Sequence, residues 1–271
     1  MIKRETNEQY SQSQGIRATA LKQMLKSPAH YKAALTVSKT SKALTNGQLV
    51  HSACLEQDLS QFVARPVDES GSLIRSNSKQ YQEFLKASEG KTAVKQEELD
   101  EMLSYLTAFT ASKQAMRLYN NSDIESSVYS KCIQTGLLLK ARPDILNLEN
   151  GFVADLKTTS SDLRNFEREI FRFNYHIQAA HYLKTIEHST GVQIKDFYFI
   201  AIEKSEVLGV QVFKLSFDLL KYSFEKWQQL INQVRACEED KAWPSYPEII
   251  TEVQMPKYLN DHNDDFNWEV A

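Results

Sequence analysis

The sequence predicts an α/β fold in which helices flank a central mixed β-sheet, with a helical N-terminal region before this core. Strand-like and helical segments alternate over residues 121–240, whereas residues 1–120 carry mainly helical periodicity. The 271 residues are 42% hydrophobic and 25% charged, which is enough for one large core. We therefore expect a single domain over residues 1–271, with residues 241–271 as an extended tail.

In the N-terminal region, apolar residues recur at spacings of three and four, as on the buried face of a helix. Helices are expected at 17–36, at 44–59 with Thr45 or Asn46 as cap, and at 95–119. Pro28 interrupts the first pattern, and because proline is tolerated in a first helical turn it predicts the start of a second helix. The polar stretch 64–80 predicts a loop.

In the core region, strands and helices are expected in the order that an α/β sheet requires. Strands are predicted at 124–134, 137–147 and 151–157, a helix at 165–188, and strands at 195–203 and 207–217. Asp218 is a suitable cap for a last helix that runs to about Glu238.

The segment around residue 150 predicts a β-hairpin that carries charged side chains. Glu149-Asn150-Gly151 lies between two apolar runs, and Asn-Gly is a strong signal for a tight hairpin turn. Asp155 and Lys157 are two residues apart, so a strand directs both to the same face. Asp144 lies across the turn and can converge on them.

Two carboxylates and an ammonium on one face of a sheet are costly unless something binds between them. A divalent metal ion is the simplest such ligand, since hard cations prefer carboxylate oxygens. The alternative is a pair of exposed edge charges, Asp144 and Asp155, with a salt bridge to Lys157.

Four further residues are candidates for the same site. Gln178 and Tyr182 are one helical turn apart, so a helix beside the hairpin could present both to it, although they could equally line a half-buried helix face. His51 shares a helix face with Gly47 and could be a ligand or a core histidine. Glu125 begins a strand and is either a further acid of the site or a solvated edge charge.

Composition excludes some classes of protein. The sequence has no run of about 18 apolar residues that could span a membrane, and its start lacks the apolar core of a signal peptide. Cys54, Cys132 and Cys237 fit neither a zinc spacing nor a disulfide framework, which is typical of a cytoplasmic protein. The net charge of −3 neither indicates nor excludes nucleic-acid binding.

One ordered set of residues resembles a known enzyme superfamily. The set comprises His51, Glu125, Pro143-Asp144, Asp155-Leu156-Lys157, Gln178 and Tyr182. It is similar to the RecB-like branch of the PD-(D/E)xK nucleases, which implies a restriction-endonuclease-like core. Ser27-Pro28-Ala29-His30-Tyr31 after Gly15-Ile16, together with Gly47-x-x-x-His51, resembles the RecE-type exonuclease domain, also called exonuclease VIII.

The resemblance implies a role for each of these residues. Asp144, Asp155, His51 and the backbone carbonyl of Leu156 would bind Mg²⁺, for which Mn²⁺ could substitute. Lys157 would position the attacking water and stabilise charge on the phosphate. Gln178 and Tyr182 would orient substrate or water. Glu125 matches a less constant acid of the superfamily.

The resemblance also implies a substrate and partners. A RecE-type enzyme digests linear double-stranded DNA from its ends, 5′ to 3′, and leaves 3′ overhangs for strand annealing in recombination and repair. Its relatives form rings, which implies a homo-oligomer such as a tetramer here, and they act with a RecT-like annealing protein. No Walker motif is present, which agrees with ATP-independent action. Lys140 and Arg142, close to Asp144, are candidates to reach DNA phosphates.

Two other functions remain open from the sequence. One is a different RecB-like nuclease, either an endonuclease or an enzyme specific for single strands. The other is a catalytically inactive DNA-binding or assembly protein, against which the intact set Asp144, Asp155 and Lys157 argues.

Overall fold

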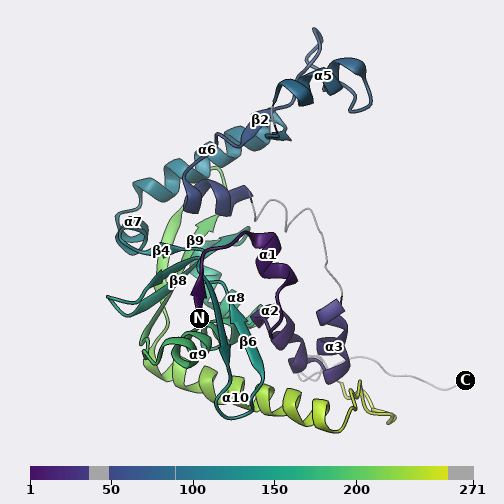
Figure 1. Cartoon of the computed structure of the whole chain (residues 1–271), viewed down its shortest axis with the longest axis vertical. Helices are drawn as coiled ribbons and strands as arrows, with labels where there is room; N and C mark the ends of the chain where they lie inside the picture. The colour runs from purple at the N-terminus through teal and green to yellow at the C-terminus, as the bar shows by residue number, and fades with distance from the viewer. Residues whose placement is uncertain (37–48, 89, 256–271) are drawn as a thin grey trace, which may run out of the picture.

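The computed structural model describes residues 1–36, 49–88 and 90–255 (Figure 1). Its centre is a five-stranded sheet in the order β10-β9-β8-β7-β4. The strands are β4 (Asp123–Ile124), β7 (Ile145–Asn147), β8 (Phe152–Thr159), β9 (Asp196–Glu203) and β10 (Val210–Lys214). The β8–β9 pair is parallel and the other pairs are antiparallel, so the predicted mixed sheet is confirmed.

Helices cover both faces of this sheet, because alternate residues of its strands point to opposite sides. On one face, Val153 and Phe199 pack against α8 (Phe166–Arg172), α9 (Tyr175–Thr190) and α10 (Phe217–Glu239). On the other face, Leu156 and Ile200 pack against α6 (Gln96–Ala111) and α7 (Lys113–Tyr119). Asp155 and Lys157 share the side of Val153, so β8 directs them towards α9.

The N-terminal segment is attached to a second, smaller sheet of order β1-β5-β6. Its strands are β1 (Ile2–Lys3), β5 (Ser127–Lys131) and β6 (Leu138–Ala141), and α1 (Asn7–Gln12) follows β1. Next come α2 (Ala18–Leu21), the 3₁₀ turn Lys22–Leu25 and α3 (Pro28–Thr36), so the helix start expected at Pro28 is confirmed. Ile16 bridges Leu139 of β6, which holds this segment beside the core.

A further part of the N-terminal region extends beyond α6 (Figure 1). It contains the parallel pair β2 (Phe62–Ala64) and β3 (Thr92–Val94) and the helix α5 (Lys79–Ala87). None of these three elements was predicted. Strands of three residues carry too little alternation to be recognised, and they form here by pairing across 30 positions of the sequence.

Breaks divide several elements that the sequence predicts as continuous. The strand expected at 137–147 is β6 and β7, separated by Arg142-Pro143-Asp144, because proline has no N–H for a sheet ladder. The strand expected at 124–134 is interrupted at Glu125, which adopts φ +47°. The helix expected at 165–188 is interrupted at Asn174, which adopts φ +53° between α8 and α9.

Two helix boundaries also differ from the predictions. The 95–119 helix ends at Ala111, and Ser112 then caps α7 by accepting a hydrogen bond from the Ala115 N–H. The cap of α10 is Ser216, whose Oγ accepts the Leu219 N–H at 3.2 Å, so the assignment of Asp218 as cap was wrong. Asp218 lies in the first turn instead, where a negative charge favours the helix dipole.

Of the helix predicted at 44–59, the caps Thr45 and Asn46 and the neighbouring Gly47 lie outside the described residues. The part that follows His51 forms a π-helical turn over Ser52–Glu56. The described part of the tail, residues 241–255, contains neither helix nor strand. Among the described helices, none is both long and apolar enough to cross a membrane.

Candidate active site

The candidate site lies where β8 extends past the start of β7. The last β7–β8 pair joins Ile145 to Ala154, so the next residues of β8 have no partner strand on that side. Asp144, just before β7, takes this place: its Oδ2 accepts the Leu156 N–H at 2.6 Å. Because the N–H and C=O of one strand residue point to the same side, the Leu156 carbonyl also faces this open edge.

Asp155 points from β8 to α9, where side chains hold it in place. The Gln178 amide donates a hydrogen bond to Asp155 Oδ1 at 2.7 Å and another to the Tyr182 hydroxyl oxygen at 3.2 Å. The Lys157 ammonium forms an ion pair with Asp155 Oδ2. The structure therefore brings Gln178, Tyr182 and Lys157 together around Asp155, as the sequence predicts.

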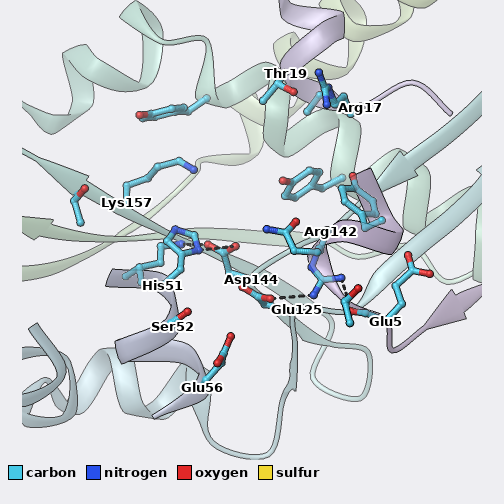
Figure 2. A pocket seen from close by; sticks show the side chains of 18 of the residues that line it. Glu5, Arg17, Thr19, His51, Ser52, Glu56, Glu125, Arg142, Asp144 and Lys157 are labelled. Atoms are coloured by element: carbon cyan, nitrogen blue, oxygen red, sulfur yellow. Dashed lines mark hydrogen bonds and ion pairs between the residues drawn. The ribbon is translucent and has the colours of Figure 1, made fainter. Parts of the chain in front are cut away.

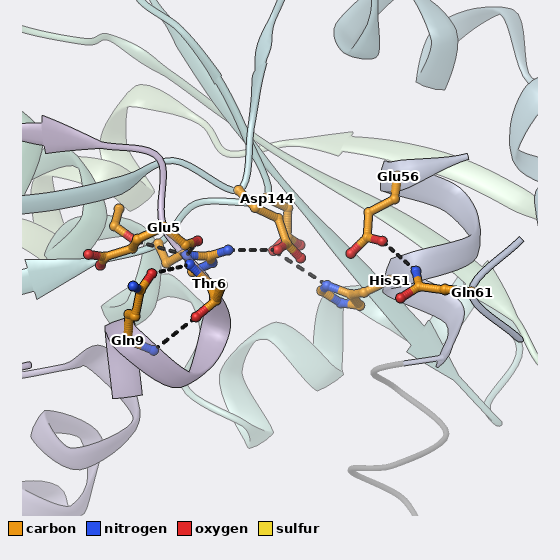
Figure 3. Close-up of polar contacts among 10 residues, drawn as sticks. Glu5, Thr6, Gln9, His51, Glu56, Gln61 and Asp144 are labelled. Carbon is orange, nitrogen blue, oxygen red and sulfur yellow. Dashed lines mark hydrogen bonds and ion pairs between the residues drawn. The ribbon is translucent and has the colours of Figure 1, made fainter. Parts of the chain in front are cut away.

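His51, which directly precedes the π-helical turn Ser52–Glu56, lies beside Asp144 (Figures 2 and 3). Its Nδ1 lies 3.5 Å from Asp144 Oδ1, although the two residues are 93 positions apart. This position agrees with a ligand beside Asp144 and not with a core histidine, while metal binding by His51 stays a prediction.

Burial has the largest effect on the charge of Asp144. Burial, and secondly the charge of Asp155, raise the pKa of Asp144 from 3.8 to about 7, against smaller lowering effects of His51 and Lys157. Burial acts to lower the pKa of Lys157, but Asp155 and Asp144 outweigh it and leave that pKa raised. The ammonium of Lys157 is thus kept protonated by the acids that it faces.

These groups open into a pocket of about 950 Å³ (Figure 2). Residues from four parts of the chain line it: Glu5, Thr6, Asn7, Tyr10, Arg17, Ala18 and Thr19; His51, Ser52, Glu56 and Gln61; Glu125, Arg142, Asp144, Leu156, Lys157 and Thr158; Tyr175 and Tyr182. We call the first group, within residues 5–19, the N-terminal wall. Figure 2 shows Arg17 and Thr19 of this wall across the pocket from Asp144.

Arg142 and Glu125 form part of the pocket lining as an ion pair. Arg142 Nη2 lies 3.0 Å from Glu125 Oε2, and its Nη1 donates to Ser127 Oγ and to the Glu5 carbonyl, both at 2.9 Å. The Glu125 N–H donates to the Asp144 carbonyl at 3.0 Å. Glu125 is therefore paired with Arg142 and is not a free edge charge, and Arg142 joins the N-terminal wall to the core.

Lys140 is placed differently from its prediction. Its side chain is only 3% exposed, and its ammonium donates to the carbonyls of Tyr10 at 2.9 Å and Ser13 at 2.6 Å. It therefore holds the N-terminal wall and is not free to reach a phosphate, which corrects its assignment to DNA binding. The sequence could not show this, because the carbonyls come from a segment about 130 positions earlier.

Several pocket residues were missed in the sequence, most of them in the N-terminal wall. Arg17 supplies a cation at the rim, where its Nη2 donates to the Ala34 carbonyl at 3.1 Å. Tyr175 lies beside the catalytic candidates, with its ring centroid 4.8 Å from Lys157 Nζ. Asn174 precedes it, and asparagine adopts the left-handed conformation more readily than most residues. That preference is the one local signal of the helix break between α8 and α9.

The chemistry of the donor set fits a divalent metal ion. Asp144 accepts a hydrogen bond from the Leu156 N–H and lies 3.5 Å from His51, and Asp155 precedes Leu156 on β8, so the donors near one another are two carboxylates, a carbonyl and an imidazole, which are ligands of Mg²⁺ and Mn²⁺. Among the residues that the structure describes, no three acidic, histidine or cysteine side chains are close enough to hold one ion as they stand. In the described structure Asp155 Oδ2 pairs with the Lys157 ammonium instead.

Comparisons with known proteins agree with this fold. The family model described as "PDDEXK-like domain of unknown function (DUF3799)" matches residues 18–255. The chain is similar to the crystal structure of a "Putative exonuclease" from Eubacterium rectale, with a TM-score of 0.59, 14% identity, and coverage of 97% of this chain and 100% of that one. At this identity the likeness shows the fold alone. No curated protein matches the sequence.

An alkaline exonuclease from Laribacter hongkongensis was also found, with a TM-score of 0.30 and 10% identity over 62% of this chain and 86% of that one. A score this low carries no argument about the present chain.

Proposed function

Since the chain belongs to the PDDEXK-like domain family DUF3799, and thus to the PD-(D/E)xK nuclease superfamily, we propose that it is a divalent-metal-dependent deoxyribonuclease. One observation carries the proposal. Asp144 and Lys157 line a pocket large enough for a nucleotide, with His51 beside Asp144, and the buried Asp155 next to them pairs with Lys157 and accepts a hydrogen bond from Gln178.

Each residue of the site has a task that its contacts support. Asp144, Asp155, His51 and the Leu156 carbonyl would hold Mg²⁺, or Mn²⁺ in its place, which polarises a phosphoryl oxygen and acidifies water when bound. Lys157 supplies a fixed positive charge for the negative charge that develops on the phosphate. Gln178 fixes the orientation of Asp155 through its 2.7 Å hydrogen bond, and Tyr182 fixes Gln178 in turn.

The finer proposal is an exonuclease of the RecE type. It would act on linear double-stranded DNA, 5′ to 3′, and leave 3′ overhangs for a RecT-like annealing protein in recombination and repair. The resemblance of Gly15-Ile16, Ser27-Pro28-Ala29-His30-Tyr31 and Gly47-x-x-x-His51 to that domain supports this assignment. A ring-shaped homo-oligomer such as a tetramer is part of the same proposal and rests on the resemblance.

The test compares DNA with and without ends. End-labelled linear duplex and covalently closed circular duplex are incubated with the protein in the presence of Mg²⁺, Mn²⁺ or a chelator. We expect loss of the linear substrate with either metal, release of label from 5′ ends, and an intact circle. Cleavage of the circle would show that the protein is an endonuclease and not an exonuclease. No cleavage of either DNA would contradict the nuclease proposal.

Two substitutions connect the activity to the site. Asp155→Asn and Lys157→Met should each lower the rate by at least about a hundredfold. The first removes the negative charge of a proposed metal ligand, and the second removes the positive charge beside the reacting phosphate. Lys184→Met is the matched control, because Lys184 lies on α9 in an ion pair with Glu187 and does not line the pocket. Full activity of either site variant would overturn the assignment.

A further inference from the structure

A series of aromatic rings leads from the catalytic lysine towards the surface. Tyr175 lines the pocket with its ring 4.8 Å from Lys157 Nζ. The Phe173 ring follows at 5.5 Å from Tyr175, because the break at Asn174 turns the end of α8 towards the start of α9. The Lys22 ammonium donates to the Phe173 carbonyl at 3.1 Å and lies 5.3 Å from the Tyr175 ring, so it connects this pair to the N-terminal segment.

A second group of rings lies at the same helix junction. The Phe171 ring lies 5.3 Å from the His176 ring, and His176 stacks on Tyr222 of α10 at 6.1 Å with an angle of 28° between planes. We call these five rings the aromatic strip: Phe171, Phe173, Tyr175, His176 and Tyr222. It consists of two groups of contacting rings, Phe173 with Tyr175 and Phe171 with His176 and Tyr222, which are joined through the consecutive residues Tyr175 and His176 at the start of α9.

Three rings of the aromatic strip are open to solvent. Phe171 is 51% exposed, Phe173 43% and Tyr222 47%. Single exposed apolar side chains are common, but several large rings in one continuous patch are typical of a binding surface. The neighbouring buried members hold the exposed rings in place, so little conformational freedom is lost when a ligand stacks on them.

Cations accompany the exposed rings. The Arg172 guanidinium lies 5.3 Å from the Phe173 ring, and Lys226 Nζ lies 5.8 Å from the Tyr222 ring. The acids of α8, Glu167 and Glu169, are in its first turn, whereas the strip begins in its last turn. Rings with cations beside them offer base stacking and phosphate binding together, which is the pattern of proteins that hold single-stranded nucleic acid.

We propose that the aromatic strip binds an unpaired stretch of a DNA strand and guides it between the surface and the catalytic pocket. The bases stack on the exposed rings, and the phosphates lie near Lys22, Arg172 and Lys226. The ligand is an unpaired strand because bases in a duplex stack on one another and present only their edges. The guidance of the strand to the pocket rests on the proposed nuclease function. The binding of the strand to the aromatic strip needs no cleavage.

The test measures binding without metal, so that catalysis plays no part. Fluorescence anisotropy of a labelled oligothymidylate and of a labelled blunt hairpin duplex is followed with the full chain and a chelator. We expect Phe171→Ser and Tyr222→Ser each to weaken oligothymidylate binding by between about fivefold and a hundredfold, since one stacked ring is lost. The duplex should bind these variants and the wild-type protein alike.

Phe217→Ser is the matched control. Phe217 is 81% exposed on the first turn of α10 but makes no ring contact with the strip, so its loss should leave both affinities unchanged. Phe171→Trp and Tyr222→Trp keep a ring at each position and should retain the wild-type affinity. In the Phe171→Trp variant, the added tryptophan fluorescence should be quenched by the oligothymidylate. These two variants keep the test decisive if a serine variant fails to fold.

Several outcomes would overturn the inference. Equal oligothymidylate affinity of the serine variants and the wild-type protein would do so, as would an equal loss for duplex and single strand. A third outcome is that the serine substitutions break up an oligomer and leave DNA affinity unchanged. The strip would then be a contact between copies of this chain. Cleavage of a small phosphodiester with Mn²⁺ tests the nuclease separately: if it fails while strand binding depends on the strip, the proposed function falls and the strip stands.

Discussion

At the scale of single residues, Asp144 makes the stability of the metal-free protein depend on pH. Its pKa is about 7 in the folded chain, against 3.8 for an ordinary aspartate, first because it is buried and then because Asp155 is close. As the pH rises from about 4 to about 7, the folded chain keeps a proton that the unfolded chain releases, so stability falls by up to about 1.4 kcal/mol per pH unit.

We therefore predict that Asp144→Asn abolishes activity and removes this loss of stability. The free energy of unfolding from urea titrations, at about pH 5 and about pH 7 without metal, should favour the variant increasingly at the higher pH. A difference between variant and wild type that is the same at both pH values would contradict the raised pKa of Asp144 in the folded chain.

His181 has the opposite effect in nearly the same pH range. Its Nε2 donates to the carbonyls of Ile16 at 3.0 Å and Lys140 at 3.1 Å, and its Nδ1 accepts the Trp227 Nε1–H at 3.1 Å. The ring is neutral, because a proton on Nδ1 would face the indole donor. Burial lowers its pKa from 6.5 to about 4.

We predict that His181→Gln makes the protein less sensitive to acid, although less stable at neutral pH. As the pH falls from 6.5 to about 4, the unfolded chain binds a proton that the folded chain excludes, so this residue lowers stability by up to about 1.4 kcal/mol per pH unit. The variant should lack that slope in urea titrations. An unchanged slope would mean that His181 is protonated in the fold.

At the scale of helices and strands, local signals predict hairpins and helix starts well and breaks poorly. Asn150-Gly151 identifies the β7–β8 hairpin because Gly151 adopts the left-handed conformation, with φ +70°, that the tight turn requires. By contrast, the sequence predicts one continuous strand through Pro143, whereas β6 and β7 on either side of it belong to different sheets. The break at Asn174 has a weak local signal, yet it turns Tyr175 towards Lys157.

The start of α10 gives a prediction at this scale. Ser216 Oγ caps the helix by accepting the Leu219 N–H, so Ser216→Ala should lower the free energy of unfolding by about 1 kcal/mol. Asp218→Asn, the comparison variant, keeps the cap and weakens only a dipole interaction, so it should cost less, about 0.5 kcal/mol. Equal losses in urea titrations, or a larger loss for Asp218→Asn, would contradict the observed cap.

At the scale of the whole molecule, the site is built from distant parts of the sequence. The acids and the lysine could be predicted because they share one hairpin, and Gln178 and Tyr182 because they share one helix face. The N-terminal wall could not, since its contacts with Lys140 and Arg142 join residues 127 to 137 positions apart. No local periodicity records such contacts.

Lys140 allows the attachment of this wall to be tested. Lys140→Met keeps the apolar stem but leaves the carbonyls of Tyr10 and Ser13 without their buried donor, so it should destabilise the protein by about 1–3 kcal/mol. Hydrogen exchange should increase in residues 5–19. Lys131→Met, on the exposed end of β5, is the control and should change neither quantity. Normal protection of the wall in the Lys140 variant would show that other contacts hold it.

The separation between the N-terminal wall and α9 also determines when the pocket can exist during protein synthesis. Tyr182 follows Tyr10 by 172 positions, which a ribosome adds in roughly 9 to 34 s at about 5–20 residues per second. For most of that interval the wall has no β6 (Leu138–Ala141) to pack against, and α9 (Tyr175–Thr190) is still incomplete at its end. A nascent chain therefore carries its first pocket residues without an assembled site, and the pocket closes only when most of the chain has been translated.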